Sequence, residues 1–148
     1  MQEATGDLWE LSSVPNGVPC VTTNGKVRKD GSCVMGRGCA LQAAKRYPDL
    51  PKRLGLQLHL SGNHVYYFED PRIITFPVKH AWWEKADTEL IARSVSELYQ
   101  IVSIEPDNLF FLPRPGCANG KLNYLKDVKP LVKELPDNVI IITNEEYK

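Results

Sequence analysis

The sequence lacks the features that mark several large classes of protein. Its apolar runs stay well short of the roughly 18 residues that a membrane-spanning helix needs, so we expect no membrane association. The segment from Met1 to Glu10 carries acidic residues and no basic-then-apolar signal pattern, which predicts a cytoplasmic protein. The 18 basic residues balance the 18 acidic ones. A net charge of zero argues against a dedicated duplex-DNA binder, but not against a nucleic-acid substrate held in a small pocket.

Metal-binding patterns are missing as well. The four cysteines stand at positions 20, 33, 39 and 117 without a C-x-x-C pair, and the three histidines stand at 59, 64 and 80. This spacing is poor for zinc, so we predict no metal site and no bound cofactor. We expect the cysteines to be reduced, small and mostly buried.

The composition is typical of one folded domain. Of the 148 residues, 43% are apolar and 24% are charged, as in globular proteins. A chain of this length can bury a core without disulfides. The 10 glycines and 11 prolines are spread along the chain, and no repeat or linker divides it. We therefore expect a single domain over 1–148, with a monomer as the default state.

Strand-like and helix-like segments alternate along the chain. The expected strands are Asp7–Leu11, Val18–Thr23, a hairpin of Gln57–Ser61 and His64–Phe68 that turns at Gly62-Asn63, Arg72–Val78, Asn108–Pro113 and Val139–Thr143. The expected helices are Cys39–Tyr47, which Pro48 and Pro51 stop, a helix capped by Asp87 that runs to about Val102, and one from about Leu122 to Leu135. This alternation predicts an α/β fold with helices on both faces of a mixed sheet. Ligands of such folds bind where the carboxyl ends of strands meet the loops.

Two glycine-containing loops follow strands, one from Asn24 to Gly38 and one from Pro113 to Gly120. Glycine lets the backbone approach a ligand closely, and N–H groups at a helix N-terminus receive phosphate. Together the loops would suit a diphosphate, although each alone is better explained as a tight turn. The second loop, G-x3-G-K-L, is one residue shorter than a nucleoside-triphosphatase loop and lacks its hydroxyl. The G-x-G at 36 to 38 lacks the third glycine of a dinucleotide fingerprint.

Four motifs come in a specific order along the chain. They are Gly6-Asp7-Leu8, which we place on the first strand, Asn24 after the second strand, Gly36-Arg37-Gly38-Cys39-Ala40 at the start of a helix, and Leu112-Pro113-Arg114-Pro115-Gly116-Cys117-Ala118 after an apolar strand. Over nearly the whole chain this order resembles the macrodomain family. The closest similarity is to the branch of terminal ADP-ribose glycohydrolases and of antitoxins that remove ADP-ribose from DNA. The resemblance implies a three-layer α/β/α fold with a central mixed sheet of about six strands.

The resemblance also implies a pocket for ADP-ribose. Asp7, between Gly6 and Leu8, would accept a hydrogen bond from the adenine amino group, and Asn144 would lie beside adenine. Asn24 would contact the distal ribose, although on local sequence it is equally well explained as part of an Asn-Gly turn. The residues that would line the two sides of the diphosphate are Gly36, Arg37 and Gly38 on one side, and Pro115, Gly116, Cys117, Ala118 and Asn119 on the other. A glutamate in place of Gly116 would then abolish binding by filling this cradle.

Members of that branch use a lysine that attacks the distal ribose, together with an acid in the second loop. Lys79 is the best match for the lysine, and its attack would need a neutral amine with a lowered pKa. The expected acid is absent, because Asn119 and Gly120 occupy its stretch. A water held between Asn24 and the diphosphate is the alternative nucleophile. The further candidate acids and bases are His80 and Asp30.

Trp82 and Trp83 follow Lys79 closely and would either wall the pocket, stack on a base or simply be packed in the core. Three functions remain open: hydrolysis of an ADP-ribosyl ester, an ADP-ribosylated base or ADP-ribose 1''-phosphate; non-catalytic reading of ADP-ribose; and another type of α/β nucleotide-binding or interaction domain. We favour the hydrolase because Asn24 and Lys79 are both present. The implied partners are ADP-ribose, an ADP-ribosylated protein or nucleic acid, and an ADP-ribosyltransferase toxin.

Overall fold

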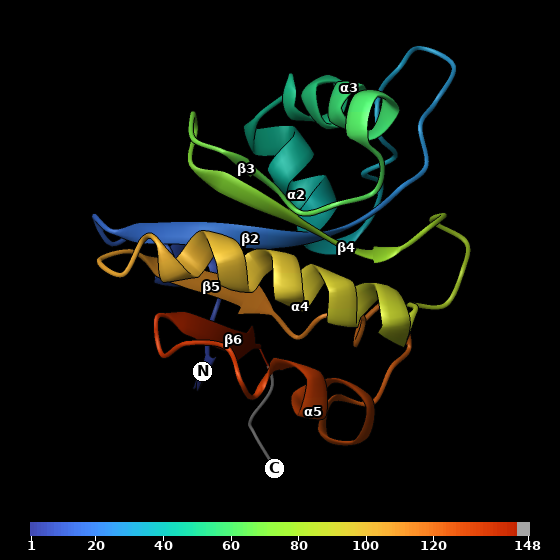
Figure 1. Cartoon of the computed structure of the whole chain (residues 1–148). Coiled ribbons are helices and arrows are strands. Elements are labelled where there is room, and N and C mark those ends of the chain that lie inside the picture. The colour runs from blue at the N-terminus through green and yellow to red at the C-terminus, as the bar shows by residue number, and fades with distance from the viewer. Residues whose placement is uncertain (145–148) are drawn as a thin grey trace.

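Six strands form one sheet between two layers of helices in the computed structural model, which describes residues 1–144 (Figure 1). The strands are β1 (Gln2–Thr5), β2 (Gly17–Asn24), β3 (Tyr66–Phe68), β4 (Ile73–Lys79), β5 (Leu109–Pro113) and β6 (Val139–Thr143). The helices are α1 (Leu8–Leu11), α2 (Gly38–Arg46), α3 (Leu50–Ser61), α4 (Thr88–Ser103), the π-helical turn η1 (Tyr124–Val128) and α5 (Lys129–Val132). The strand order is β1-β6-β5-β2-β4-β3, with β3 antiparallel to β4 and the other neighbours parallel. The predicted three-layer α/β/α fold with a mixed sheet is confirmed.

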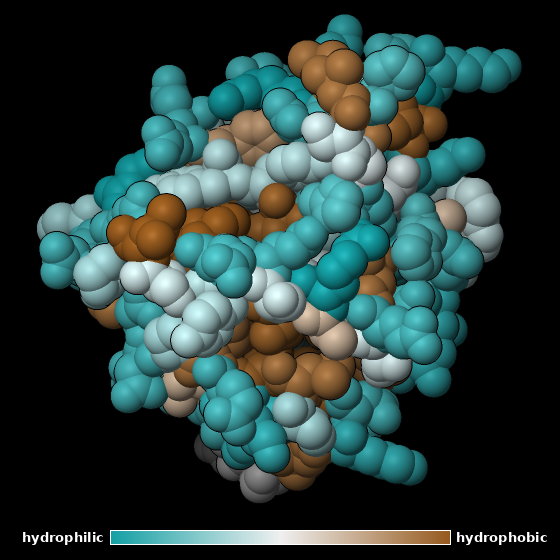
Figure 2. All heavy atoms as spheres, in the orientation of Figure 1, coloured by the Kyte–Doolittle hydropathy of each residue, from teal (hydrophilic) through white to brown (hydrophobic). Residues whose placement is uncertain are grey.

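Each face of the sheet has its own apolar core, because successive side chains of a strand point to opposite faces. Helix α4, with η1 and α5, covers the face that carries Phe76 and Phe110. Helices α1, α2 and α3 cover the face that carries Ile73 and Phe111. Figure 2 shows the α4 side as largely hydrophilic, with hydrophobic spheres gathered beside α4 and over α3. No helix of residues 1–144 has the length and apolar character that crossing a membrane requires.

Helix α4 forms as the sequence predicts. The side chain of Asp87 caps it by accepting a hydrogen bond from Glu89 N at 2.9 Å. Its apolar stripe faces the sheet, where Ile91, Leu98 and Val102 are buried. Helix α2 ends at Arg46, one residue before the predicted end at Tyr47, and Pro48 follows.

The first predicted strand is wrong. Residues 8 to 11 form the short helix α1, and the first strand is Gln2–Thr5, which the sequence analysis missed. Asp7 therefore does not lie on a strand but caps α1, since its Oδ2 accepts hydrogen bonds from Trp9 N at 3.0 Å and Glu10 N at 3.1 Å. A side chain that satisfies two N–H groups locally favours a helix start over an extended strand.

The predicted hairpin of Gln57–Ser61 with His64–Phe68 is also wrong. Residues 57 to 61 are the end of α3, and β3 pairs with β4 instead. Pro51 lies in the first turn of α3, where a proline fits, so it opens this helix as well as following α2. Leu50, Leu54 and Leu58 recur every fourth residue and are buried, which is the helical signal that the analysis missed.

The predicted helix from Leu122 to Leu135 is shorter and irregular. It consists of the π-helical turn η1 followed by the four-residue helix α5, with Pro130 in the first turn of α5. The second glycine loop therefore does not run directly into a helix, as we expected, but is separated from η1 by residues 121 to 123.

Candidate functional site

The parallel strands all end at the same edge of the sheet, and a cavity of about 570 Å³ lies there. It lies at the carboxyl-terminal ends of β2, β4, β5 and β6, where the first glycine loop, the second glycine loop and α1 also meet. This is the edge at which α/β folds bind ligands. The position of the cavity agrees with the sequence-based expectation.

The cavity brings together most of the predicted site residues. Those that line it are Gly6, Asp7, Leu8, Asn24, Gly36, Arg37, Gly38, Lys79, Gly116, Ala118, Asn119 and Asn144. Pro115 and Cys117 are not among the described residues that line it. The lining residues that the sequence analysis did not single out include Thr22, Thr23, Arg28, Met35 and Gln42. Gln42 follows Gly38 by one helical turn, a spacing that could have pointed to it.

One end of the cavity is formed by α1 and the end of β6. Gly6 N donates a hydrogen bond to Thr143 O at 2.9 Å, which ties the segment before α1 to β6. Asp7 turns its carboxylate toward the N-terminus of α1 and lines the cavity at the same time. Asn144, which follows β6, is exposed and also lines the cavity.

The first glycine loop is organised by Asn24. Its Nδ2 donates to Val34 O at 2.9 Å, and its Oδ1 accepts from Lys26 N at 2.8 Å. The amide therefore holds the start and the end of the loop together beside the cavity. Both polar atoms of the Asn24 side chain are therefore engaged in hydrogen bonds that shape the loop. The Asn-Gly turn in the sequence only indicated such a role.

The start of α2 presents backbone to the cavity. Gly36 is exposed, and apart from its chain neighbours no described heavy atom lies within 4 Å of where a Cβ would stand. Arg37 precedes the nine-residue helix α2 with an extended backbone, and its side chain makes no capping hydrogen bond to the first turn. The free N–H groups and the helix dipole make this a favourable place for an anion.

The second glycine loop packs tightly against α4. Gly116 has φ +73°, and a Cβ on it would lie 2.8 Å from Ala86 Cβ and 2.9 Å from Leu122 Cδ1. Gly116 O accepts from Leu122 N, and Gly120 O accepts from Ala86 N. A side chain at Gly116 would therefore point into the core and not into the cavity, which corrects the reason we expected for the effect of glutamate there. The loop reaches the first loop at Asn119, whose Nδ2 would lie 3.4 Å from a Cβ on Gly38.

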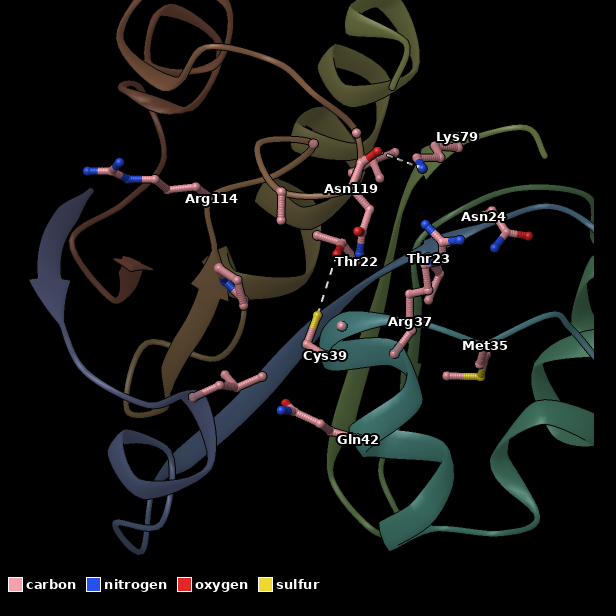
Figure 3. Close-up of a pocket in the computed structure, with 18 of the residues that line it drawn as sticks. Thr22, Thr23, Asn24, Met35, Arg37, Cys39, Gln42, Lys79, Arg114 and Asn119 are labelled. Atoms are coloured by element: carbon pink, nitrogen blue, oxygen red, sulfur yellow. Dashed lines mark hydrogen bonds between the residues drawn. The ribbon is translucent and has the colours of Figure 1, made fainter. Parts of the chain in front are cut away.

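Lys79 projects from the end of β4 toward the second loop (Figure 3). Its Nζ donates to Asn119 O at 3.2 Å and to Trp82 O at 3.3 Å. Burial is the main cause that lowers the pKa of Lys79, and the positive charges of Arg37 and Lys121 lower it further. A lowered pKa increases the fraction of neutral amine, which is the form that can act as a nucleophile.

Within the described part of the chain, Asp7 is the one acidic residue that lines the cavity. His80 is paired with Asp87 at 3.0 Å, and Asp30 accepts hydrogen bonds from Ser32, so both predicted alternatives are engaged elsewhere. The end of the cavity near Lys79 is therefore cationic.

Three further side chains, those of Arg114, Trp82 and Trp83, differ in orientation and exposure. Arg114 lines the cavity, but its guanidinium points away and lies 4.3 Å from the ring centre of Tyr124 (Figure 3). Trp82, which lines the cavity, and Trp83 are 49% and 60% exposed. Their rings are perpendicular with centroids 5.5 Å apart, and Lys26 Nζ lies 5.6 Å from the centre of the Trp83 ring. Buried packing, one of the three uses considered for these residues, is thereby ruled out.

The four cysteines are free. Cys20 and Cys33 are buried, which raises the pKa of Cys33 to about 12, so these thiols are unreactive. Residues 1–144 contain no group of three histidine, cysteine, aspartate or glutamate side chains that could hold a metal ion.

The fold of the chain matches that of solved macrodomains. The macrodomain of Mycobacterium tuberculosis DarG is 22% identical, with a TM-score of 0.76 over 97% of each chain. Thermosipho africanus DarTG in complex with ADP-ribose is 18% identical, with a TM-score of 0.75 over 99% of this chain and 43% of that one. The macrodomain of Thermus aquaticus DarG is 22% identical, with a TM-score of 0.71 over 98% and 97%. No family model and no curated protein matches the sequence. The protein has the macrodomain fold, as the order of its motifs predicts.

Proposed function

We propose that this protein binds ADP-ribose in the strand-end cavity. The diphosphate would lie between the start of α2 and the second glycine loop, with adenine toward Asp7 and the distal ribose toward Lys79. The observation that carries this proposal is the exposed backbone at Gly36, which faces the second loop across the cavity and leaves free N–H groups for phosphate. The similar Thermosipho africanus structure, which holds ADP-ribose, supports the same ligand.

We further propose that the protein hydrolyses the bond between the distal ribose and an acceptor. Neutral Lys79 would form a bond to the anomeric carbon of the ribose while the acceptor leaves with the bonding electron pair and takes up a proton. Water would then displace the lysine and release ADP-ribose. One water molecule is consumed for each acceptor released. The lowered pKa of Lys79, which burial and the positive charges of Arg37 and Lys121 cause, supports this role. In the alternative route, water attacks directly and Lys79 only contributes charge.

The surroundings of Lys79 favour a nucleobase as the acceptor. Trp82, which lines the cavity, and its neighbour Trp83 are exposed and offer planar faces. Base stacking on such faces contributes about 1–3 kcal/mol per base. Lys26 beside Trp83 would suit a nearby phosphate. The corresponding partner is an enzyme that transfers ADP-ribose from NAD to a nucleic acid, since only such a reaction supplies this substrate.

A second function, reading ADP-ribose without chemistry, is favoured by one observation. No described carboxylate lines the end of the cavity near Lys79, so nothing there resembles the acid expected for the lysine route.

Calorimetric titration with ADP-ribose, AMP and NAD tests the binding proposal. We expect one-to-one binding of ADP-ribose that is much tighter than that of AMP. No heat at millimolar ligand would refute both functions. Incubation with a single-stranded oligonucleotide ADP-ribosylated on one base then separates the functions, because a hydrolase releases free ADP-ribose and a reader only binds. An ADP-ribosylated glutamate peptide and ADP-ribose 1''-phosphate serve as the alternative substrates.

A further inference from the structure

The loop between α3 and β3 reaches the end of β4 through Asn63. Its side-chain Nδ2 donates a hydrogen bond to Lys79 O at 3.0 Å. Asn63 is half-buried and is not among the described residues that line the cavity. It therefore contacts the peptide of Lys79 from outside the site.

The same loop is fastened to α4 on its other side. The carboxylate of Glu97 accepts from Val65 N at 3.0 Å and pairs with His64 Nδ1 at 2.5 Å. The guanidinium of Arg93 donates to Asn63 O. Asn63 is thus held by α4 through its carbonyl and holds β4 through its amide.

The end of β4 needs such support because the β2–β4 ladder is irregular there. Thr23 pairs with Pro77, but Asn24 pairs with Lys79, so Val78 is skipped in the register. A bulge of this kind bends the strand and re-aims the following side chain. The ladder alone therefore leaves the direction of Lys79 poorly determined.

Gly25 leaves the space that the Asn63 amide occupies. A Cβ on Gly25 would lie 2.8 Å from Asn63 Nδ2 and 3.1 Å from His80 O. Gly25 N also donates to His80 O at 3.1 Å. The carbonyls of the two consecutive residues Lys79 and His80 are each fixed by a group from outside β4.

We propose that Asn63 is a positioning residue for Lys79, an inference that rests on the proposed hydrolytic function. By fixing the Lys79 peptide just after the bulge, it sends the side chain to the point where Nζ lies between Asn119 O and Trp82 O. Without that hydrogen bond the last residue of β4 can rotate, and the amine leaves the end of the cavity where the distal ribose would lie.

Free ADP-ribose provides a test that does not require the natural acceptor. Its distal ribose opens to an aldehyde, which a neutral lysine amine converts to an imine with loss of water. Added cyanoborohydride then supplies a hydride and leaves a stable secondary amine. Peptide mapping by mass spectrometry locates and quantifies the adduct at position 79, and calorimetry gives the affinity for ADP-ribose in parallel.

The test variant is Asn63→Asp, which keeps the shape but places a carboxylate oxygen against Lys79 O. The matched control is Asn16→Asp, because Asn16 Nδ2 makes the same kind of bond, to Asp107 O at 2.9 Å, at the opposite edge of the sheet. Asn63→Ser is a second variant without added charge. Thermal unfolding identifies any variant that fails to fold.

We expect Asn63→Asp and Asn63→Ser to bind ADP-ribose within about threefold of the wild type while trapping at Lys79 at least tenfold more slowly. Asn16→Asp should trap at the wild-type rate. Trapping in both Asn63 variants at the wild-type rate would overturn the inference and leave the proposed function intact. Wild-type protein that binds ADP-ribose without trapping at Lys79 would also overturn it. Failure of the proposed function is recognised separately, by absence of ADP-ribose binding or of turnover in the wild type.

Discussion

Replacing Gly36 by alanine separates ligand binding from folding more cleanly than any other change at the first glycine loop. Gly36 is exposed, its φ is outside the left-handed region, and a Cβ there would meet no described atom within 4 Å other than its chain neighbours. The methyl group would therefore stand in open space at a residue that lines the cavity. In the complex it would occupy space that the diphosphate needs.

The expected magnitudes follow from these contacts. Folding should be unaffected or stabilised by about 0.4–1 kcal/mol, because alanine has less freedom in the unfolded chain. Binding should lose at least one hydrogen bond to a charged phosphate, about 1.5–3 kcal/mol, which corresponds to a dissociation constant roughly 10-fold to 150-fold higher. Calorimetric titration with ADP-ribose and urea unfolding measure the two effects.

Gly31→Ala is the matched control, since a Cβ at Gly31 also meets no described atom within 4 Å. Gly31 has φ +90° and does not line the cavity, so alanine there should cost about 1–2 kcal/mol of stability and leave ADP-ribose affinity unchanged. Gly36→Ala should thus lose affinity for ADP-ribose and keep its stability, whereas Gly31→Ala should lose stability and keep its affinity. Unchanged affinity in Gly36→Ala would refute the placement of the diphosphate at the start of α2.

Substitutions at three other positions test separate parts of the site. Lys79→Ala should keep ADP-ribose affinity within a few-fold and abolish release of ADP-ribose from the substrate; unchanged turnover, measured by chromatography, would leave the direct water route. Asp7→Ala should lower stability by about 1 kcal/mol through loss of the α1 cap and weaken both ADP-ribose and AMP, whereas Asp7→Asn should retain the cap and lose mainly affinity. Trp82→Ala should raise KM for an ADP-ribosylated oligonucleotide about fivefold or more without changing the affinity for free ADP-ribose, and equal KM values would argue against base stacking.

The sequence predicted best where one strong signal dominated. Continuous apolar runs such as Val139–Thr143 identified buried strands, and the apolar stripe after Asp87 identified α4, because burial overrides weaker local preferences. The prediction was wrong at Asp7, where a capping side chain converts a short apolar run into a helix. It was wrong again at Gln57–Ser61, where Pro51 was interpreted as a stop and not as a first-turn residue.

The candidate site shows the same division between local and long-range information. The glycine loops were recognisable from composition, but the two glycines that matter most differ in role. Gly36 has open space around it, whereas Gly116 is required by close contacts with Ala86 and Ile91, which come from an earlier part of the chain. The bond from Asn63 to the Lys79 peptide spans 16 positions and has no local signal. Such contacts become visible only once the fold brings the segments together.

The pH dependence of turnover decides what Lys79 contributes to the reaction. Among the described side chains at the end of the cavity where the distal ribose would lie, Lys79 has a lowered pKa, caused first by burial and then by the charges of Arg37 and Lys121. If its neutral amine attacks the ribose, kcat/KM rises with pH and levels off above a pKa that lies below the ordinary lysine value of 10.5. If the ammonium instead donates a proton to the leaving acceptor, kcat/KM falls through the same pKa. We expect the rise. Lys121→Gln removes one of the charges that lower the pKa of Lys79, so it should move the rise in kcat/KM to higher pH. A kcat/KM that falls with pH, or a profile that this substitution does not shift, would refute the role of Lys79 as the nucleophile.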